Sequence, residues 1–361
     1  MRKKVLVDAA SLLLRSAGVK NYTFHWLRAL EQQAPGMFDA YPFLGTSLGA
    51  LNHDGSNFSL SATVPRIAAL QFFNKVMPAA LTPFVRKYAL FHVSNQVKHP
   101  PPGVPVSATV HDMTCWLLPE THTAANRQAD EAFADRVLRR ARGLIAVSEH
   151  TRQDAIRILD LNPDRIRTIY SGVPEAYFDA TPAVRSKPYV LYAGTIEPRK
   201  NVDLLLNAFA TLDSGHELLI AGPEGWNSAH TMGRLRGNAV PNVRYLGYVP
   251  EADMPGLFAG ATAFVYPSLY EGFGFPVAQA MAARVPVVTS NASCLPEVAG
   301  DGAITVDPRS EAELAAALSR VIGDASLRRS LAAAGRERAE LYRWETCARQ
   351  SIAWFRELTE A

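Results

Sequence analysis

Short apolar runs alternate with stretches of helical periodicity along both halves of the chain, and this alternation limits the fold more than any other feature. The runs that read as buried strands cover residues 4–8, 90–94, 106–110, 143–147, 166–170, 189–193, 217–222, 243–247, 263–266 and 286–289. Strands that alternate with helices form parallel sheets, and such open sheets bind ligands at the carboxyl ends of their strands. The sequence therefore predicts an α/β protein with two doubly wound, Rossmann-like domains that face each other across a cleft.

The length of 361 residues is enough for two domains that each bury a core of their own. Residues 177–187 carry Thr, Pro and Ser without periodicity, as is typical of an interdomain linker. We therefore expect an N-terminal domain over residues 1–180 and a C-terminal domain over 181–343. A last helix is expected near residues 344–358.

Composition excludes several classes of protein. The sequence has no uncharged apolar run of about 18 residues, so a transmembrane helix is not expected. The basic start leads directly into the first strand and does not resemble a signal peptide. The three cysteines, Cys115, Cys294 and Cys347, show neither a disulfide framework nor zinc spacing. We expect a cytoplasmic protein without a bound metal or cofactor.

Charge is shared unevenly between the two halves. Residues 1–180 hold 20 Lys and Arg and 15 Asp and Glu, whereas residues 181–361 hold 17 and 19. The basic excess of the first half is too small to indicate nucleic acid, but it suits an anionic substrate or membrane surface. Aromatic residues among Lys75, Arg86 and Lys87, over residues 67–91, predict a buried core segment. The alternative is an amphipathic face that lies on a membrane.

The most informative stretch runs from residue 263 to residue 283. An apolar run is followed by Gly272 and Gly274, then by Pro276, which suits the first turn of a helix. The free N–H groups at a helix start attract anions. Glu271 would repel a phosphate there, so we expect it to accept hydrogen bonds from hydroxyls. A phosphate with hydroxyls nearby describes a sugar nucleotide. The alternative is a structural turn whose glycines serve backbone geometry alone.

Two adjacent cations, Arg199 and Lys200, follow the first strand of the second half. Arg can bind two phosphate oxygens at once and Lys adds a point charge, so the pair suits a diphosphate. Cations are unfavourable near a helix start unless an anion binds, which favours a role in anion binding over an exposed structural pair.

Near the N-terminus, a loop with Gly18 precedes a helix expected over residues 22–32. This loop is either a phosphate loop or a plain turn.

His111 and Asp112 end the predicted strand 106–110, where open α/β sheets bind ligands. The alternative for His111 is a satisfied structural histidine. No Ser–His–Asp order, Cys–His pairing or P-loop is present. The chemistry must therefore come mainly from holding a good leaving group, and a nucleoside diphosphate leaves well if its developing charge is stabilised.

Taken together, these motifs resemble the retaining family 4 glycosyltransferases of the GT-B fold. Gly194-Thr-Ile-Glu-Pro-Arg-Lys-Asn201 is similar to the family's diphosphate segment, and Tyr266-Pro-Ser-Leu-Tyr-Glu-Gly-Phe-Gly-Phe-Pro276 to its donor-sugar segment. The segments 287–290, 295–300, 110–112 and 147–154 continue the resemblance, which covers nearly the whole chain. It implies that the last helix, over residues 344–361, crosses back onto the first domain.

The resemblance also assigns roles to matching positions. It implies that Arg199 and Lys200 bind the donor diphosphate and that Glu271 meets sugar hydroxyls. His111 would lie near the transferred sugar. Gly18 would let the first-domain loop approach the phosphate, and backbone near Tyr248 would border the base. The donor would also contact Gly272 and the backbone of Phe273, Gly274 and Phe275.

Gln279 departs from the family pattern, which has a second Glu at this position to hold the ribose. An amide can accept a hydrogen bond from a ribose hydroxyl but lacks the strength of a charged acceptor. We therefore expect weaker nucleotide binding or a different hold on the ribose, without loss of activity.

The resemblance implies a retaining hexosyltransferase that moves a sugar from a nucleoside diphosphate to a glycan or polyprenyl-linked acceptor. Bacterial surface-polysaccharide enzymes are the most similar, which favours GDP-mannose as the donor and polysaccharide or lipopolysaccharide synthesis as the setting. The expected location is the cytoplasm, with a peripheral contact at the inner membrane face as an open alternative. Two other functions remain open: a sugar-nucleotide epimerase of the same fold, and a non-catalytic nucleotide-sugar binding protein.

Overall fold

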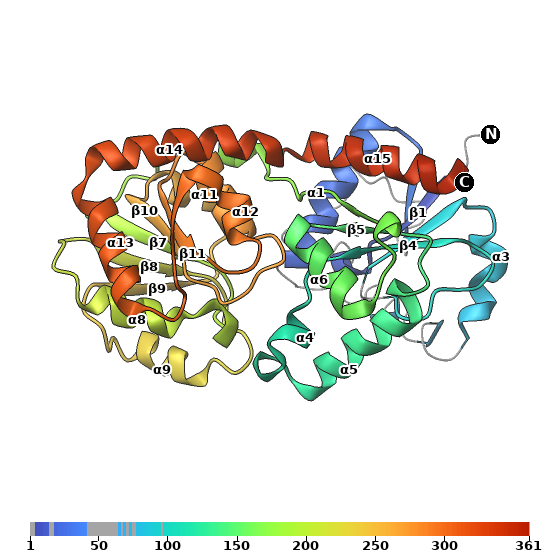
Figure 1. The fold of residues 1–361 in the computed structure, drawn as a ribbon, viewed down its shortest axis with the longest axis horizontal. Coiled ribbons are helices and arrows are strands. Elements are labelled where there is room, and N and C mark those ends of the chain that lie inside the picture. Colours follow the sequence, from blue (N-terminus) through green and yellow to red (C-terminus); the bar gives the residue numbers. More distant parts are fainter. Residues whose placement is uncertain are drawn as a thin grey trace. The chain divides into compact units, whose positions relative to one another are not determined.

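In the computed structural model, residues 4–13, 18–41, 64–65, 68–69, 72–73, 77–94 and 97–360 are described. The chain divides into two compact units, residues 1–172 with 344–361 (unit 1) and residues 173–343 (unit 2). In each unit, parallel strands form a sheet with helices packed on it, so the predicted α/β class with two doubly wound domains is confirmed (Figure 1). The polar stretch 46–65, rich in Gly, Ser and Asn and therefore expected to be a surface loop, lies almost entirely outside the described residues.

Unit 1 contains a parallel sheet that, over the described residues, has six strands in the order β2-β1-β3-β4-β5-β6. The strands are almost continuously apolar because both faces of the sheet are covered. Their bounds are β1 Val5–Asp8, β2 Phe38–Tyr41, β3 Leu90–Val93, β4 Val106–Val110, β5 Gly143–Ala146 and β6 Ile166–Thr168.

The helices of unit 1 are α1 Gly18–Gln33, α3 Thr82–Val85, α4 Thr114–Leu117, α5 Ala124–Phe133, α6 Glu149–Leu159 and α15 Trp344–Glu360. A π-helical turn, Ala134–Leu138, extends α5. Helix α1 starts at Gly18 and not near Tyr22, which places Gly18 in a helix and not in a loop.

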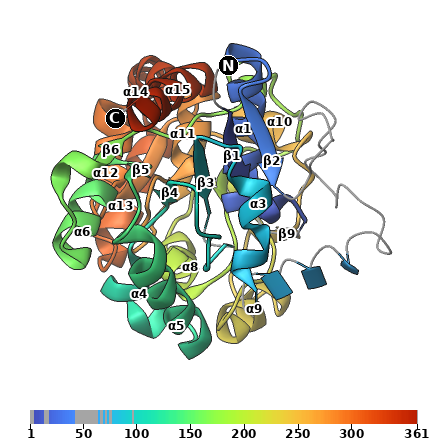
Figure 2. The ribbon, with the colours of Figure 1, turned by 90° about the vertical axis from the view of Figure 1, so that its right-hand side faces the viewer.

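The C-terminal helix α15 lies beside α1 in unit 1 (Figure 2). The indole N–H of Trp26 donates a hydrogen bond to Ser351 at 3.0 Å, and the Trp26 ring packs against Phe355. Gly143 lies directly under the same helix, because an added Cβ there would come 2.5 Å from Leu358. Packing of this kind, across more than three hundred positions of sequence, cannot be read from local patterns.

Unit 2 contains a second parallel sheet, with six strands among the described residues in the order β12-β11-β10-β7-β8-β9. The bounds are β7 Tyr189–Ala193, β8 Glu217–Ala221, β9 Val243–Gly247, β10 Ala263–Tyr266, β11 Val287–Ser290 and β12 Ala303–Val306. The edge strands β2 and β12 of the two sheets were not anticipated from the sequence. Strand β2 is interrupted by Asp39 and β12 is mostly only partly buried, so neither reads as a continuous buried apolar run.

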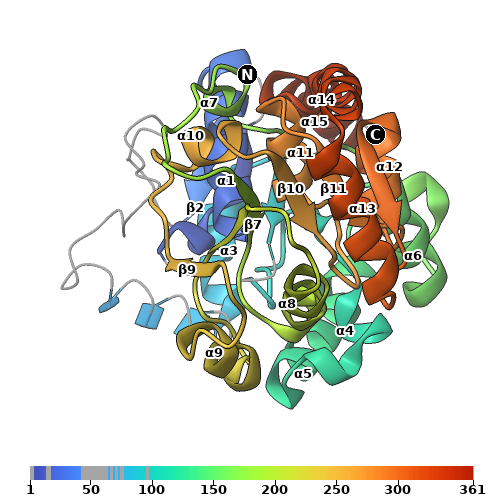
Figure 3. The same ribbon diagram turned by 90° about the vertical axis from the view of Figure 1, so that its left-hand side faces the viewer.

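The helices of unit 2 are α7 Glu175–Phe178, α8 Val202–Ala210, α9 Ala229–Arg236, α10 Met254–Ala259, α11 Phe275–Ala282, α12 Leu295–Ala299, α13 Glu311–Gly323 and α14 Ala325–Ala339. Helix α11 packs against α14, and α8 packs against α13 (Figure 3). The helix α9 was missed by the sequence reasoning, which left residues 223–242 unassigned.

The boundary between the units falls at residues 172 and 173, eight residues before the expected boundary at 180. The backbone N–H of Val173 donates to the carbonyl of Tyr342 at 2.7 Å, and the ring of Tyr177 contacts Phe258. These contacts hold residues 173–178 on unit 2. Chain composition did not reveal them: the linker was expected over residues 177–187, yet its first two residues, Tyr177 and Phe178, are buried in α7.

Residues 67–91 were expected to be core or a membrane-facing surface, and their described part shows both kinds of environment. Tyr88 and Val85 are buried, whereas Phe72 is 47% exposed. The Lys87 ammonium lies 4.7 Å from the centre of the Phe84 ring. No helix among the described residues is long and apolar enough to cross a membrane.

Candidate functional site

A tight turn joins β10 to α11 and presents Glu271 at the carboxyl end of the unit 2 sheet. Gly274 has a φ of +82°, and an added Cβ would come 2.6 Å from Leu295, so only glycine suits this position. Pro276 lies in the first turn of α11, as the sequence indicated. The backbone N–H of Glu271 is fixed by the hydroxyl of Ser293 at 2.9 Å.

A second loop, after β7, brings Arg199 and Lys200 to the same place. The short 3-10 helix Pro198–Lys200 ends at Asn201, which is left-handed with φ +60°. The Asn201 amide donates to the carbonyls of Pro267 and Pro308, at 3.1 and 2.7 Å. The carbonyl of Arg199 accepts from the N–H of Leu269 at 2.8 Å. The two loops are therefore joined by hydrogen bonds, although nearly seventy residues of sequence separate them.

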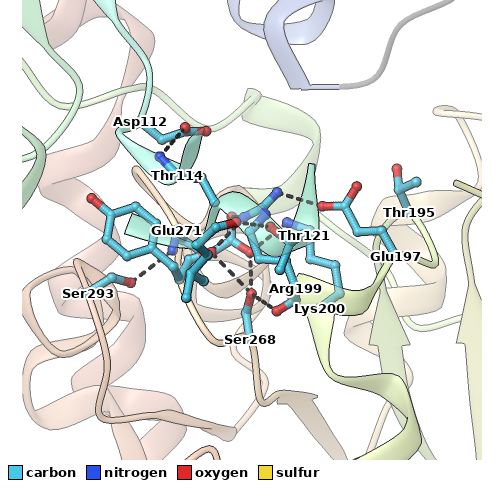
Figure 4. A network of polar contacts seen from close by, with 12 residues as sticks. Asp112, Thr114, Thr121, Thr195, Glu197, Arg199, Lys200, Ser268, Glu271 and Ser293 are labelled. Carbon is cyan, nitrogen blue, oxygen red and sulfur yellow. Dashed lines mark hydrogen bonds and ion pairs between the residues drawn. The ribbon is translucent and has the colours of Figure 1, made fainter. Parts of the chain in front are cut away.

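The side chains of these loops form a buried charge cluster, Glu197, Arg199, Lys200 and Glu271 (Figure 4). The Lys200 Nζ lies 2.5 Å from Glu271 Oε1, and an Arg199 nitrogen lies 2.9 Å from Glu271 Oε2. Another Arg199 nitrogen lies 2.7 Å from Glu197 Oε1. The exposed fractions of these four side chains range from 2% to 12%, so the ions are shielded from water and held by their partners.

Neutral hydroxyl groups complete the surroundings of Glu271. Ser268 Oγ donates to Glu271 Oε1 at 2.6 Å, and the Tyr266 hydroxyl donates to the same oxygen at 3.1 Å. The Tyr266 hydroxyl also accepts from Lys200 Nζ at 2.8 Å. Tyr266 and Ser268 thus position the charged groups, a role that sequence reasoning missed although both stand in the recognised motif.

Electrostatics keep the Glu271 carboxylate ionised. Burial opposes the charged form of Glu271, but Arg199 and Lys200 outweigh it and lower the pKa of Glu271 to about 2. Burial, with Arg199 adding to it, lowers the pKa of Lys200 from its ordinary value, and Glu271 opposes that change. The sequence predicts that Arg199 and Lys200 lack an anion until a ligand binds. In the structure, the carboxylates of Glu197 and Glu271 already form ion pairs with them.

The structure brings Arg199, Lys200 and Glu271 together, and Gly272, Phe273, Gly274 and Phe275 follow directly in the turn. Phe273 is buried against Phe275 and the ring of Tyr342, so its side chain supports the turn.

Gln279 and Tyr248 belong to other elements of unit 2. Gln279, in α11, is only 9% exposed. Tyr248 follows β9 and is 63% exposed.

Unit 1 carries the other predicted residues. His111 follows β4, and its ring meets the edge of Tyr22 at 4.9 Å. Burial lowers the pKa of His111 to about 4, with Asp112 opposing, so the ring is neutral at pH 7. A Cβ added to Gly18 would meet no atom within 4 Å, so the fold of unit 1 does not itself require glycine there.

Two further carboxyl groups were missed. Glu197 belongs to the charge cluster, and its place two residues before Arg199 was the available signal. Asp8 ends β1 and hydrogen-bonds the hydroxyl and N–H of Ser94. Burial raises the pKa of Asp8 to about 6, against the opposing bonds from Ser94 and Ala10. Among the described residues, no group of three His, Cys, Asp or Glu side chains could hold a metal ion.

Two family models match the sequence side by side. The model described as "Glycosyl transferases group 1" matches residues 174–338, and the model "Glycosyltransferase Family 4" matches residues 60–177. The chain is 36% identical over 260 residues to O-antigen chain mannosyltransferase B of Escherichia coli, in a match that covers 68% of each protein.

Solved structures show the same fold. The sucrose-phosphate synthase of Thermosynechococcus elongatus superposes with a TM-score of 0.75 at 19% identity, covering 99% of both chains. The Anabaena protein HepE, in complex with UDP and glucose, gives a TM-score of 0.71 at 18% identity and covers 98% of this chain and 99% of its own.

Proposed function

This chain belongs to the family 4 glycosyltransferases of the GT-B fold, and from that premise we propose that it is a retaining mannosyltransferase that uses GDP-mannose. The acceptor in this proposal is a glycan or polyprenyl-linked saccharide of a bacterial surface polysaccharide, and the setting is the cytoplasmic face of the membrane. Mannose is supported by the 36% identity with an O-antigen mannosyltransferase, and nucleotide-sugar chemistry by the likeness to HepE in complex with UDP and glucose.

The observation that carries this proposal is that Arg199 and Lys200 form buried ion pairs with Glu271. A glycosyl donor leaves as a nucleoside diphosphate, which develops negative charge as the bond to the sugar breaks. Two cations fixed in a water-poor site can stabilise that charge without reorganising. The carboxylate beside them can accept hydrogen bonds from sugar hydroxyls and so hold the sugar next to its leaving group.

In the proposed reaction, the bond between the anomeric carbon and the diphosphate oxygen breaks, and a bond to the acceptor oxygen forms on the same face. The acceptor hydroxyl gives its proton to the departing phosphate oxygen. Arg199 and Lys200 would stabilise the diphosphate, and Glu271 would orient the sugar. The assignments of His111 to the sugar, and of Gly18, Tyr248, Gln279 and the backbone of residues 272–275 to the donor, stay predictions.

The test separates this function from the two alternatives on the same fold. The purified chain is incubated with GDP-mannose, GDP-fucose, UDP-glucose or UDP-galactose, together with a polyprenyl-linked or oligosaccharide acceptor. We expect a glycosylated acceptor with the anomeric configuration of the donor, read by NMR. An epimerised free nucleotide sugar would instead identify an epimerase, and binding without turnover would identify a binding protein. An inverted product would refute the retaining mechanism.

A further inference from the structure

The charge cluster of unit 2 is balanced before any donor arrives. Glu197 and Glu271 contribute two negative charges, and Arg199 and Lys200 contribute two positive charges. Buried ions are costly unless they are paired, and here the protein's own groups supply the pairing. It also means that a diphosphate meets cations that already have a partner.

An incoming diphosphate competes directly with Glu271. Both Arg199 and Lys200 contact this one carboxylate, at 2.9 and 2.5 Å. A phosphate oxygen that replaced it as their partner would bring two like charges close together in a site with little water. Like charges at such distances disfavour each other strongly, so Glu271 must gain other hydrogen bonds when the cations turn to the phosphate.

We propose that donor binding is an exchange of partners: the diphosphate takes Arg199 and Lys200 from Glu271, and the sugar hydroxyls take their place on the carboxylate. This inference rests on the proposed function and concerns how the same site couples binding of the diphosphate to binding of the sugar. Glu271 then competes with the diphosphate for the two cations, and it also increases the affinity for a donor whose sugar hydroxyls it can bind.

The cations keep their positions during such an exchange because each has an anchor besides Glu271. Lys200 Nζ donates to the Tyr266 hydroxyl at 2.8 Å. Arg199 is held by Glu197 at 2.7 Å and by the carbonyl of Tyr270 at 2.6 Å. The cations can therefore change one partner without moving away from the site.

Glu271 also keeps neutral donors throughout. Ser268 Oγ, at 2.6 Å, and the Tyr266 hydroxyl, at 3.1 Å, carry no charge and do not bind phosphate in place of a cation. The carboxylate therefore keeps two hydrogen-bond donors when the cations turn to the phosphate, and its remaining acceptor positions can receive sugar hydroxyls. The exchange as proposed is a change of hydrogen-bond partners among side chains.

The exchange predicts effects of opposite sign for one substitution. Glu271→Gln removes the internal competitor, so a nucleoside diphosphate without sugar should bind more tightly. A close charge commonly shifts a pKa by about one unit, and the same free energy corresponds to about tenfold in affinity. The same variant loses the charged acceptor for the hydroxyls. The extra affinity of the nucleotide sugar over the bare nucleotide should then shrink or disappear.

Calorimetric titration of GDP and GDP-mannose into the wild type and Glu271→Gln tests the proposal. Glu337→Gln, on the exposed side of α14, makes the same change in net charge away from the cluster and should leave both affinities unchanged. Weaker or unaltered GDP binding by Glu271→Gln would overturn the exchange while leaving the proposed function intact. Failure of the wild type to bind GDP, UDP or their sugars would instead count against the proposed function.

A second measurement needs no variant. In the wild type, methyl α-mannoside at saturating concentration should tighten GDP binding, and GDP should tighten binding of the mannoside by the same factor, because the coupling is reciprocal. Independent or mutually weakening binding, where both ligands bind, would contradict the exchange even if Glu271→Gln failed to fold.

Discussion

Replacing Lys200 by alanine should weaken binding of the nucleoside diphosphate by about 10- to 100-fold. The side chain is 10% exposed, so a hydrogen bond from it to phosphate is protected from water. Hydrogen bonds to charged groups contribute about 1.5–3 kcal/mol, and each 1.4 kcal/mol is a factor of ten in affinity. The variant also leaves Glu271 with one cation fewer, which increases the repulsion that the phosphate meets.

Removal of Lys200 also affects folding, so stability is measured first. Breaking a buried ion pair costs about 3–5 kcal/mol when the remaining charge has no partner. Glu271 keeps Arg199 at 2.9 Å, so we expect a loss at or below the lower end of that range. Thermal melting of wild type and variant sets a temperature at which both are folded, and calorimetry with GDP and UDP follows there.

Lys187→Ala is the matched control, because Lys187 is 58% exposed and makes a distant pair with Glu217 at 3.9 Å. It changes the net charge equally and should leave nucleotide affinity within about twofold, as expected for an exposed pair. If Lys200→Ala bound GDP and UDP as tightly as the wild type, the assignment of Lys200 to the diphosphate would be refuted.

Three further outcomes are expected. Gln279→Glu should strengthen GDP binding by about tenfold, measured by calorimetry, because a charged acceptor holds ribose hydroxyls more strongly than an amide; equal affinity would remove Gln279 from the ribose contact. Gly143→Ala should lower the free energy of unfolding by about 1–3 kcal/mol in urea titrations, since its Cβ would come 2.5 Å from Leu358, whereas Gly233→Ala, with open space in a helix, should not destabilise. The folded pKa of Glu271, about 2, lies below its ordinary value of 4.5, so its contribution is complete above pH 4.5 and is lost as pH falls toward 2. Wild type should therefore lose about 3 kcal/mol more than Glu271→Gln over that window in denaturation at graded pH.

Local patterns in the sequence were sufficient for the fold class. Parallel strands buried on both faces are continuous apolar runs, and β7, β8 and β10 all have that character. The turn before α11 could be placed because Gly274 and Pro276 have backbone preferences of their own. The edge strands β2 and β12 lack this signal, because Asp39 interrupts β2 and most of β12 is only partly buried.

The sequence by itself determined which chemistry is present, since Arg199, Lys200 and Glu271 could be named from residue type and motif. Only the tertiary structure decided their partners: the loop with Lys200 meets the loop with Glu271 after a gap of 71 residues, and the cations become occupied by carboxylates. The physical reason is that charge pairing depends on distance in space and on burial, and neither quantity is contained in the order of residues along the chain.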